Sequence, residues 1–256
     1  MADENHPGAR RWSRFTAAAP AGAGLPTDVA TYGADVPAEP TLRLLGPLDG
    51  KRVLDVGCGA GHGSVAFAHQ GARVFAIDAS AAQVAAARQA ADAAGVRVEL
   101  HHGDLADLAF LRKDTVDAAF SAYALTEVDD LDRVFRQVHR VLKPEAPLVF
   151  SLPHPAYVML EHVSAGATAG SQPPPSLARR YLDRSEIGWD RGDQPVVDHP
   201  RPLADVFLRL MRTNFRVDTL LEPDASEADQ PRSEHWSPAM AWVPPTVILR
   251  ARKEGI

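Results

Sequence analysis

The sequence predicts an open α/β fold in which strands and helices alternate along the chain. Between residues 51 and 152, short apolar runs of strand length alternate with alanine-rich or amphipathic segments of helix length. Strands separated by helices at this spacing form parallel sheets with right-handed crossovers. The strands expected in this part of the chain cover residues 52–56, 73–77, 96–100, 116–122 and 148–152.

The segments between these strands carry helix signals. Residues 64–70 are alanine-rich and stop at Gly71, a residue type favoured after helix C-termini. Ser80 followed by Gln83 matches the capping-box pattern at the start of a second, long helix. Within residues 131–142, apolar side chains recur at the spacing of one helical face. We therefore expect a helix at each of these three places.

The regular pattern pauses after the fifth strand and then resumes. The middle of residues 156–200 is rich in Gly, Ala and Pro, which predicts a long loop or partly ordered insertion. An amphipathic helix follows, and two further strands are expected at 215–221 and 246–251. No helical pattern separates these two strands, so they are expected to run antiparallel. The expected organisation is an N-terminal segment, residues 1–44, and one domain, residues 45–256, that carries the insertion.

Composition narrows the classes of function. The 256 residues include 33 acidic and 27 basic side chains, so the net charge of −6 gives no broad positive field for nucleic acid. Cys58 is the single cysteine, which excludes an intrachain disulfide and fits a reducing cytoplasm. No apolar run reaches the length of about 18 residues that predicts a membrane span. These features favour a cytoplasmic protein that binds neither nucleic acid nor membranes, and they carry no signal for an oligomeric state.

A glycine-rich loop follows the first expected strand, at the edge where open α/β sheets bind their ligands. Gly57, Gly59 and Gly61 allow the backbone to turn sharply and to approach a ligand closely. The dinucleotide-binding pattern G-x-G-x-x-G requires a third glycine at position 62 if it starts where the strand ends. That position holds His62, so the loop argues against a nicotinamide dinucleotide.

Acidic residues end the second strand and follow the third. Asp78 can accept hydrogen bonds from both hydroxyls of a ribose, or it can serve only as a helix cap. Its distance from the glycine loop favours the ribose. Asp104 can accept from an adenine amino group while Leu105 packs on the ring, although Asp104 alone is equally a turn residue.

The combination of loop and strand ends resembles the class I S-adenosylmethionine-dependent methyltransferases. Residues 53–61 are similar to motif I of that family, 76–80 to its second motif and 102–105 to its third, and 117–152 are similar to later motifs. Within the family, the likeness is to small-molecule methyltransferase-like proteins of actinobacterial type. The resemblance implies a Rossmann-like, seven-stranded, mostly parallel sheet with an antiparallel last strand and helices on both faces. It also implies S-adenosylmethionine as the cofactor and a small molecule as the methyl acceptor.

The same resemblance implies which residues hold the cofactor. The three glycines would cradle its methionine part, Asp78 the ribose, and Asp104 with Leu105 the adenine. Ser121 would lie under the methionine end through its backbone, and Tyr32 would close over the cofactor from the N-terminal segment. The implied set is Tyr32, Asp55, Gly57, Gly59, Gly61, Asp78, Ala79, Asp104, Leu105 and Ser121.

The acceptor side has weaker signals. The expected reaction is an in-line displacement at the sulfonium methyl, where positioning contributes about 7–11 kcal/mol. A general base is needed only if the acceptor must lose a proton early. Tyr123, Glu127 and His154 follow strand ends, and His154 and Tyr123 are the expected catalytic residues. His154 can instead be a loop residue whose ring is satisfied by backbone or water. The insertion, with Tyr181, Ile187 and Trp189, is the expected cover over the acceptor.

Other classes of function have less support. His101 and His102 are neighbours on an expected strand and point to opposite faces, so no metal site is expected there. A nucleic-acid methyltransferase is disfavoured because residues 121–124, Ser-Ala-Tyr-Ala, stand where that class carries an Asn/Asp-Pro-Pro-Tyr/Phe-type motif. A regulatory or degenerate domain that binds the cofactor without turnover stays open as the alternative function.

Overall fold

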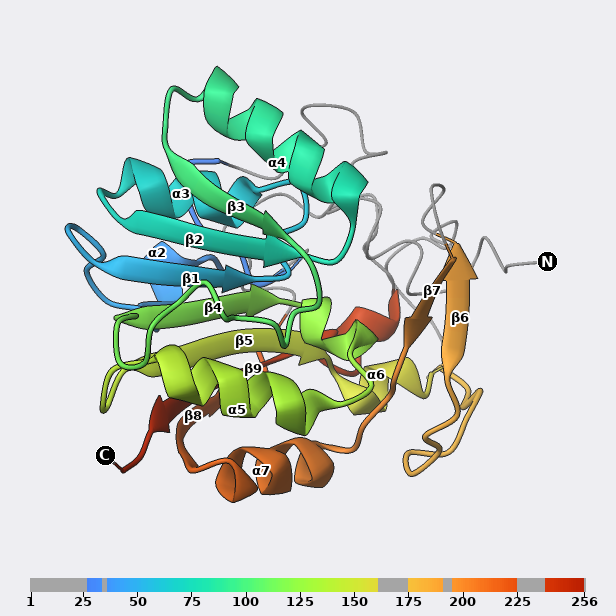
Figure 1. Cartoon of the computed structure of the whole chain (residues 1–256). Helices are drawn as coiled ribbons and strands as arrows, with labels where there is room; N and C mark the ends of the chain where they lie inside the picture. Colours follow the sequence, from blue (N-terminus) through green and yellow to red (C-terminus); the bar gives the residue numbers. More distant parts are fainter. Residues whose placement is uncertain (1–26, 34–35, 161–174, 191–194, 225–237, 256) are drawn as a thin grey trace.

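The computed structural model describes residues 27–33, 36–160, 175–190, 195–224 and 238–255. Within these residues one seven-stranded sheet has the order β3-β2-β1-β4-β5-β9-β8, and a separate two-stranded sheet pairs β6 with β7 (Figure 1). The large sheet consists of β1 (Arg52–Val56), β2 (Arg73–Asp78), β3 (Val98–His102), β4 (Ala118–Ala122), β5 (Pro147–Pro153), β8 (Phe215–Leu221) and β9 (Thr246–Lys253).

Strand direction in the large sheet follows the expected pattern. The five strands β1 to β5 are parallel, with β1 central between β2 and β4. The last strand, β9, runs antiparallel to both of its neighbours, β5 and β8. The expectation of a mostly parallel sheet with an antiparallel last strand is therefore confirmed. Figure 1 shows the arrowheads of β1 to β5 pointing toward the side of the molecule where β6 and β7 lie.

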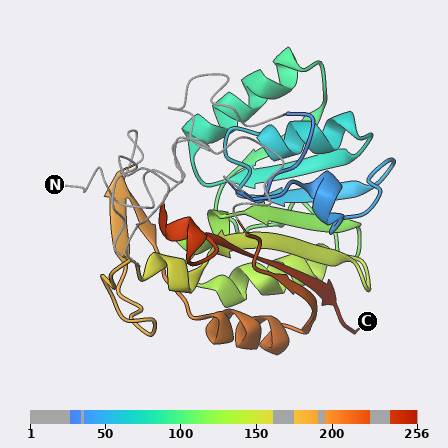
Figure 2. The same cartoon turned by 180° about the vertical axis from the view of Figure 1, so that it is seen from behind.

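Helices cover both faces of this sheet. On one face lie α3 (His62–His69) and α4 (Ala81–Ala93), with the short α2 (Glu39–Leu42). Figure 2, in which the molecule is turned by 180°, shows this face toward the viewer. On the other face lie α5 (Leu131–Val141) and α7 (Leu203–Arg212). Each layer of helices closes its own apolar core: Phe135 and Leu210 belong to one cluster, whereas Phe67 belongs to the other.

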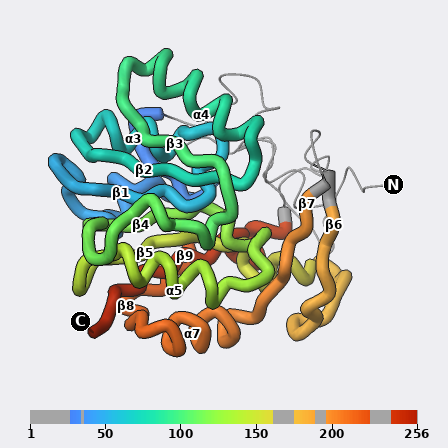
Figure 3. The backbone as a smooth tube through the Cα atoms, viewed as in Figure 1, coloured from blue at the N-terminus to red at the C-terminus, as the bar shows by residue number. Residues whose placement is uncertain are grey.

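The insertion contains structure that the sequence analysis missed. It holds the short helix α6 (Pro155–Val158) and an antiparallel hairpin of β6 (Ile187–Asp190) and β7 (Pro195–Asp198). Each of these strands has four residues, and a glycine and an aspartate stand in β6, so neither has the length or the alternation that predicts a strand. Figure 3 shows the hairpin beside the carboxyl edge of the large sheet. The Gly/Ala run at 165–170 lies outside the described residues.

A buried carboxylate holds the described part of the N-terminal segment together beside the sheet. Glu39 accepts hydrogen bonds from the backbone N–H groups of Leu44 and Leu45, at 3.1 and 2.6 Å, and from the hydroxyl of Tyr32. Around it, Tyr32 packs on Phe120 of β4, with 5.5 Å between the ring centroids. The segment thus contributes to the core on the α3 face of the sheet.

The described residues contain neither a membrane-spanning helix nor a cluster of metal ligands. No helix among them combines the length and the apolar character needed to cross a membrane. No group of three or more His, Cys, Asp or Glu side chains in the described part of the chain could hold a metal ion.

Candidate active site

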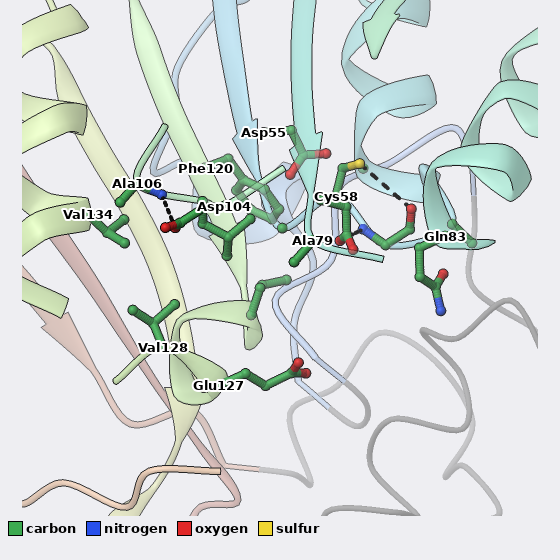
Figure 4. A pocket seen from close by; sticks show the side chains of 18 of the residues that line it. Asp55, Cys58, Ala79, Gln83, Asp104, Ala106, Phe120, Glu127, Val128 and Val134 are labelled. Atoms are coloured by element: carbon green, nitrogen blue, oxygen red, sulfur yellow. Dashed lines mark hydrogen bonds between the residues drawn. The ribbon is translucent and has the colours of Figure 1, made fainter. Parts of the chain in front are cut away.

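A cavity of about 520 Å³ lies at the carboxyl edge of the parallel strands. Its walls come from the loops after β1, β2, β3 and β4, from the start of α4 and from the first turn of α5 (Figure 4). The lining residues are Thr31, Asp55, Gly57, Cys58, Gly59, Ala60, His62, Gly63, Asp78, Ala79, Gln83, Asp104, Leu105, Ala106, Phe120, Ala122, Ala124, Glu127, Val128, Asp129, Asp130, Arg133 and Val134.

The glycine loop lines this cavity because its backbone has a conformation that other residues resist. Gly57, Gly59 and Gly61 have φ angles of 73°, 53° and 85°, in the left-handed region. A Cβ added at Gly57 would overlap the Cβ of Ala124, in the loop after β4. The loop therefore packs closely on its neighbour and leaves backbone groups exposed to the cavity.

Asp78 connects the loops after β1 and β2. Its carboxylate accepts from the backbone N–H of Gly59 at 2.8 Å and from that of Ser80 at 2.9 Å. The carboxylate is 8% exposed and lines the cavity. An ionised carboxylate offers about four acceptor positions to N–H and hydroxyl donors such as those of a ribose. Asp78 thus fixes the loop and is also placed to bind a ligand.

The structure corrects one detail of the expected capping box. Ser80 caps α4 by accepting from the backbone N–H of Gln83 at 3.3 Å, as expected. The reciprocal bond is absent among the described residues, because the Ser80 N–H donates to Asp78 instead. The Gln83 side chain is buried and lines the cavity, and its Oε1 has no hydrogen-bond partner in the part of the chain that the structure describes. Buried amide oxygens are rarely left unpaired, so Gln83 is a ligand-binding candidate that the capping pattern concealed.

Asp104 and Leu105 both line the cavity, as expected, but Asp104 has a partner that the sequence did not reveal. Its carboxylate accepts from the Ala106 N–H at 2.8 Å and from the Arg133 guanidinium at 2.7 Å. The Asp104 side chain is 54% exposed, so this ion pair is weak, about 0–1 kcal/mol, and an adenine amino group can compete with it. Arg133 lies on the polar face of α5, where nothing in the sequence distinguishes it.

Asp55 is the most buried acid of the cavity. Burial raises the pKa of its carboxyl to about 7, an effect that the Ser64 hydroxyl opposes and the charge of Asp78 increases. The Ser64 hydroxyl donates to Asp55 at 2.6 Å. Because a cation near this carboxyl would favour its ionised form, the site suits a ligand that carries positive charge.

Cys58 and His62 lie in the same loop without features of catalytic groups. Burial raises the pKa of the Cys58 thiol well above its usual value, with the charge of Asp55 adding to the effect. Burial lowers the pKa of His62, which keeps the ring neutral. A protonated thiol is a poor nucleophile, so Cys58 is not suited to nucleophilic catalysis.

The two expected catalytic side chains do not reach the cavity. Tyr123 is 1% exposed, and its hydroxyl is hydrogen-bonded to Thr246 of β9. His154 is 6% exposed; its Nε2 contacts Glu222 at 2.7 Å, and its Nδ1 accepts from the Ala156 N–H at 3.1 Å. Both ring nitrogens of His154 are therefore engaged, which matches its alternative as a satisfied loop residue. Neither side chain is among the described residues that line the cavity, and the catalytic role of each stays a prediction.

Two expected cofactor residues also lie behind the cavity wall. Ser121 is fully buried in β4, and its Oγ has no partner among the described residues. Tyr32 is fully buried against Phe120, whereas its neighbour Thr31 lines the cavity. Thr31, which precedes Tyr32, and Ala122, which follows Ser121, line the cavity. Ser121 was expected to contact the cofactor through its backbone, and that role stays a prediction.

The structure brings the remaining expected cofactor residues together around one space. These are Asp55, Gly57, Gly59, Gly61, Asp78, Ala79, Asp104 and Leu105; all line the cavity except Gly61, which is the N-cap of α3. Glu127, named for acceptor handling, lines it as well, and Figure 4 shows it on the opposite side from Asp55.

Comparison with known proteins identifies the family. Residues 53–145 match the family model described as "Methyltransferase domain". The chain is 39% identical over 191 residues to the ubiquinone biosynthesis O-methyltransferase of Pseudomonas syringae pv. tomato, covering 68% of this chain and 80% of that protein. A solved S-adenosylmethionine-dependent methyltransferase from Mesorhizobium loti is 29% identical, with a TM-score of 0.63 over 84% of this chain and 96% of that one. A putative methyltransferase from Listeria monocytogenes, 21% identical, shares the fold with a TM-score of 0.67 over 85% and 96% of the two chains. The chain belongs to the class I S-adenosylmethionine-dependent methyltransferases.

Proposed function

We propose that this methyltransferase acts on a small-molecule acceptor that enters the 520 Å³ cavity from the side of Glu127. The observation that carries the proposal is the convergence of the glycine loop, Asp78 and Asp104 on one space of small-molecule size. Curated relatives named as ubiquinone biosynthesis O-methyltransferases support a small organic acceptor.

The cavity residues fit the chemistry of S-adenosylmethionine. Asp78 and the unpaired Oε1 of Gln83 offer acceptors for ribose hydroxyls. Leu105, Val128 and Val134 offer an apolar wall beside Asp104 for the adenine. Asp55 provides negative charge near the glycine loop for the cationic methionine end. When bound, this cofactor supplies a methyl group on a positively charged sulfur, which leaves as a neutral sulfide on transfer.

The contribution of the chain is mainly orientation. The glycine loop and Asp78 hold the cofactor in one orientation. This orientation lowers the entropy cost of bringing the methyl group and the acceptor together. Among the three candidates for acceptor handling, Glu127 is the one whose side chain lines the cavity. We assign to Glu127 the binding of the acceptor group or the removal of its proton.

The N-terminal segment and the insertion are proposed to complete the acceptor side. Thr31 of the N-terminal segment lines the cavity. Tyr181 and Ile187 of the insertion line a separate space of about 40 Å³ next to the end of β5. The β6–β7 hairpin stands beside the same edge of the sheet (Figure 3). These elements are the proposed cover that excludes water from the acceptor.

A labelled-methyl experiment tests this function. Cell extract and a panel of small phenols, amines and carboxylic acids are incubated with the protein and isotopically labelled S-adenosylmethionine. We expect a labelled small molecule, formed together with S-adenosylhomocysteine. Binding of the cofactor with no product from any acceptor would favour the alternative, a domain that binds without turnover.

Glu127→Gln tests the assigned side chain once an acceptor is known. The variant should bind S-adenosylhomocysteine as the natural chain does. Its kcat/KM for the acceptor should fall by about 10²–10⁴-fold if Glu127 removes a proton, the usual contribution of a general base. The matched control is Glu99→Gln, which changes an exposed acid of β3 outside the cavity.

A further inference from the structure

The loop after β4 forms one wall of the cavity and is held from behind by the end of the insertion. Thr126 lies in this loop, and its carbonyl accepts from the backbone N–H of His199 at 2.8 Å. Two residues later in each segment, the Arg201 guanidinium donates to the carbonyls of Val128 and Asp129, the latter at 3.0 Å. The wall segment 127–130 therefore depends on contacts that come from outside the cavity.

Arg201 is built to hold this position. Its other Nη atom donates to the carbonyl of His199 at 3.0 Å, so one side chain bridges both segments. Pro200 and Pro202 flank it in the chain and fix their own φ angles, which restricts the backbone. The Nδ1 atom of His199 adds a weak contact to the Asp129 carboxylate at 4.0 Å.

The hydrogen-bond partners of the Arg201 guanidinium are backbone carbonyl groups. Burial lowers the pKa of its guanidinium to about 10, and the charge of Arg209 adds to this effect. The group is still protonated at neutral pH. Within the part of the chain that the structure describes, Arg201 makes no ion pair with Asp or Glu, in contrast to Arg209, which pairs with Asp132 at 3.0 Å. The charges of Asp129, Asp205 and Asp132 oppose the effect of burial, and the three carbonyl contacts hold the guanidinium in place.

The held segment matters because of what it presents to the cavity. Val128 lies on the same wall as Val134 and Ala106, close to Asp104, as Figure 4 shows. This is the end of the cavity proposed above for the adenine. A shift of the Val128 carbonyl would move the Val128 side chain as well and open this wall.

We propose that Arg201 is a positioning residue through which the end of the insertion sets the shape of the adenine end of the cofactor cavity. The proposal rests on the function proposed above. It connects the element expected to cover the acceptor with the element expected to bind the cofactor. An insertion displaced by an acceptor would then change cofactor affinity through this side chain.

Calorimetric titration with S-adenosylhomocysteine tests the proposal. Arg201→Ala should raise the dissociation constant by about tenfold or more, a loss of roughly one charged hydrogen bond. Arg201→Lys keeps the charge but cannot span three carbonyls, so it should weaken binding by about threefold to tenfold. Arg209→Ala is the matched control, since it removes a neighbouring cation whose partner, Asp132, does not line the cavity, and its dissociation constant should stay within about twofold of the natural value.

The outcomes separate positioning from simple stabilisation. If Arg201→Ala lowers the melting temperature but binds S-adenosylhomocysteine as tightly as the natural chain, the proposal is overturned. If the alanine variant does not fold, the lysine variant decides in the same way. If the natural chain binds no S-adenosylhomocysteine, the proposed function fails first. Amide hydrogen exchange at residues 126–130 then decides the proposal: exchange as slow in Arg201→Lys as in the natural chain overturns it.

Discussion

The cavity at the carboxyl edge of the sheet has two halves, the loops after β1 to β3 and the loops after β4 and β5. The sequence predicted the site residues of the first half better than those of the second. In the loops after β1, β2 and β3, the residues expected at the site line one cavity, apart from Gly61, which is the N-cap of α3. In the loops after β4 and β5, Glu127 lines the cavity, but Tyr123 and His154 turn away and bind Thr246 and Glu222, 123 and 68 residues further along the chain. In the first half, the groups at the site are backbone atoms of the glycine loop and aspartates at strand ends. Their position along the chain is sufficient to place them at the cavity. The second half is decided by distant partners that no local pattern contains.

The largest effect is expected from the glycine loop. Gly57→Val should abolish detectable binding of S-adenosylhomocysteine, because its backbone is left-handed and a Cβ there would overlap Ala124. Calorimetric titration measures the loss. The matched control is Gly188→Ala in β6, where an added Cβ meets no atom within 4 Å. Normal binding by the valine variant would show that the loop is misplaced in this account.

A smaller loss is expected at the second strand. Asp78→Ala removes the acceptor for the Gly59 N–H and the proposed ribose contact together. A hydrogen bond to a charged group contributes about 1.5–3 kcal/mol, so the dissociation constant for S-adenosylhomocysteine should rise roughly tenfold to a hundredfold. Asp92→Ala, at the exposed end of α4, is the control. Equal affinity in the natural chain and in Asp78→Ala would remove Asp78 from the site.

A variant of His154 tests the difference between the two halves from the side of the loops after β4 and β5. His154→Ala should lower the free energy of unfolding by about 0.5–2 kcal/mol, because it removes the side chain that caps α6 at the Ala156 N–H and contacts Glu222. Urea denaturation measures this change, and cofactor affinity should be unaltered. A variant that keeps its stability but loses methyl transfer would restore the catalytic prediction and make the two halves alike.

The smallest effect concerns pH. The Asp55 carboxyl, with a pKa of about 7, is mostly protonated below neutral pH. A cationic ligand favours the ionised form, so binding of S-adenosylmethionine below pH 7 must release a proton and is weakened. Affinity should therefore rise by a few-fold from about pH 6 to pH 8 and then level off. Asp55→Asn should remove most of this dependence. An equally steep profile in that variant would assign the titration to another group.

Much of the fold could be read from local patterns. The seven expected strands lie within about two residues of those in the large sheet, and the antiparallel pair followed from the missing crossover helix. The hairpin β6–β7 was missed because its strands are short and one contains Gly188. Arg133 and Arg201 were missed for a different reason: each acts through contacts with segments 29 or more residues away, which the periodicity of a helix or loop does not record.

Gln83 shows how one local pattern can conceal another role. Its position three residues after Ser80 predicted a role in capping the helix. The Gln83 backbone N–H has this role, because it donates to the Ser80 hydroxyl. Its side chain is free of that task because Asp78 holds the Ser80 N–H. The amide therefore lines the cavity, a result that depends on the packing of α4 against the glycine loop.

The central claim is that the cavity at the carboxyl edge binds S-adenosylmethionine and its product. Isothermal titration of the full natural chain with S-adenosylhomocysteine, and separately with NAD, tests it most directly. We expect saturable binding of one S-adenosylhomocysteine per chain and no heat of binding from NAD. Saturable binding of NAD, or no binding of S-adenosylhomocysteine at concentrations that saturate related methyltransferases, would contradict the account.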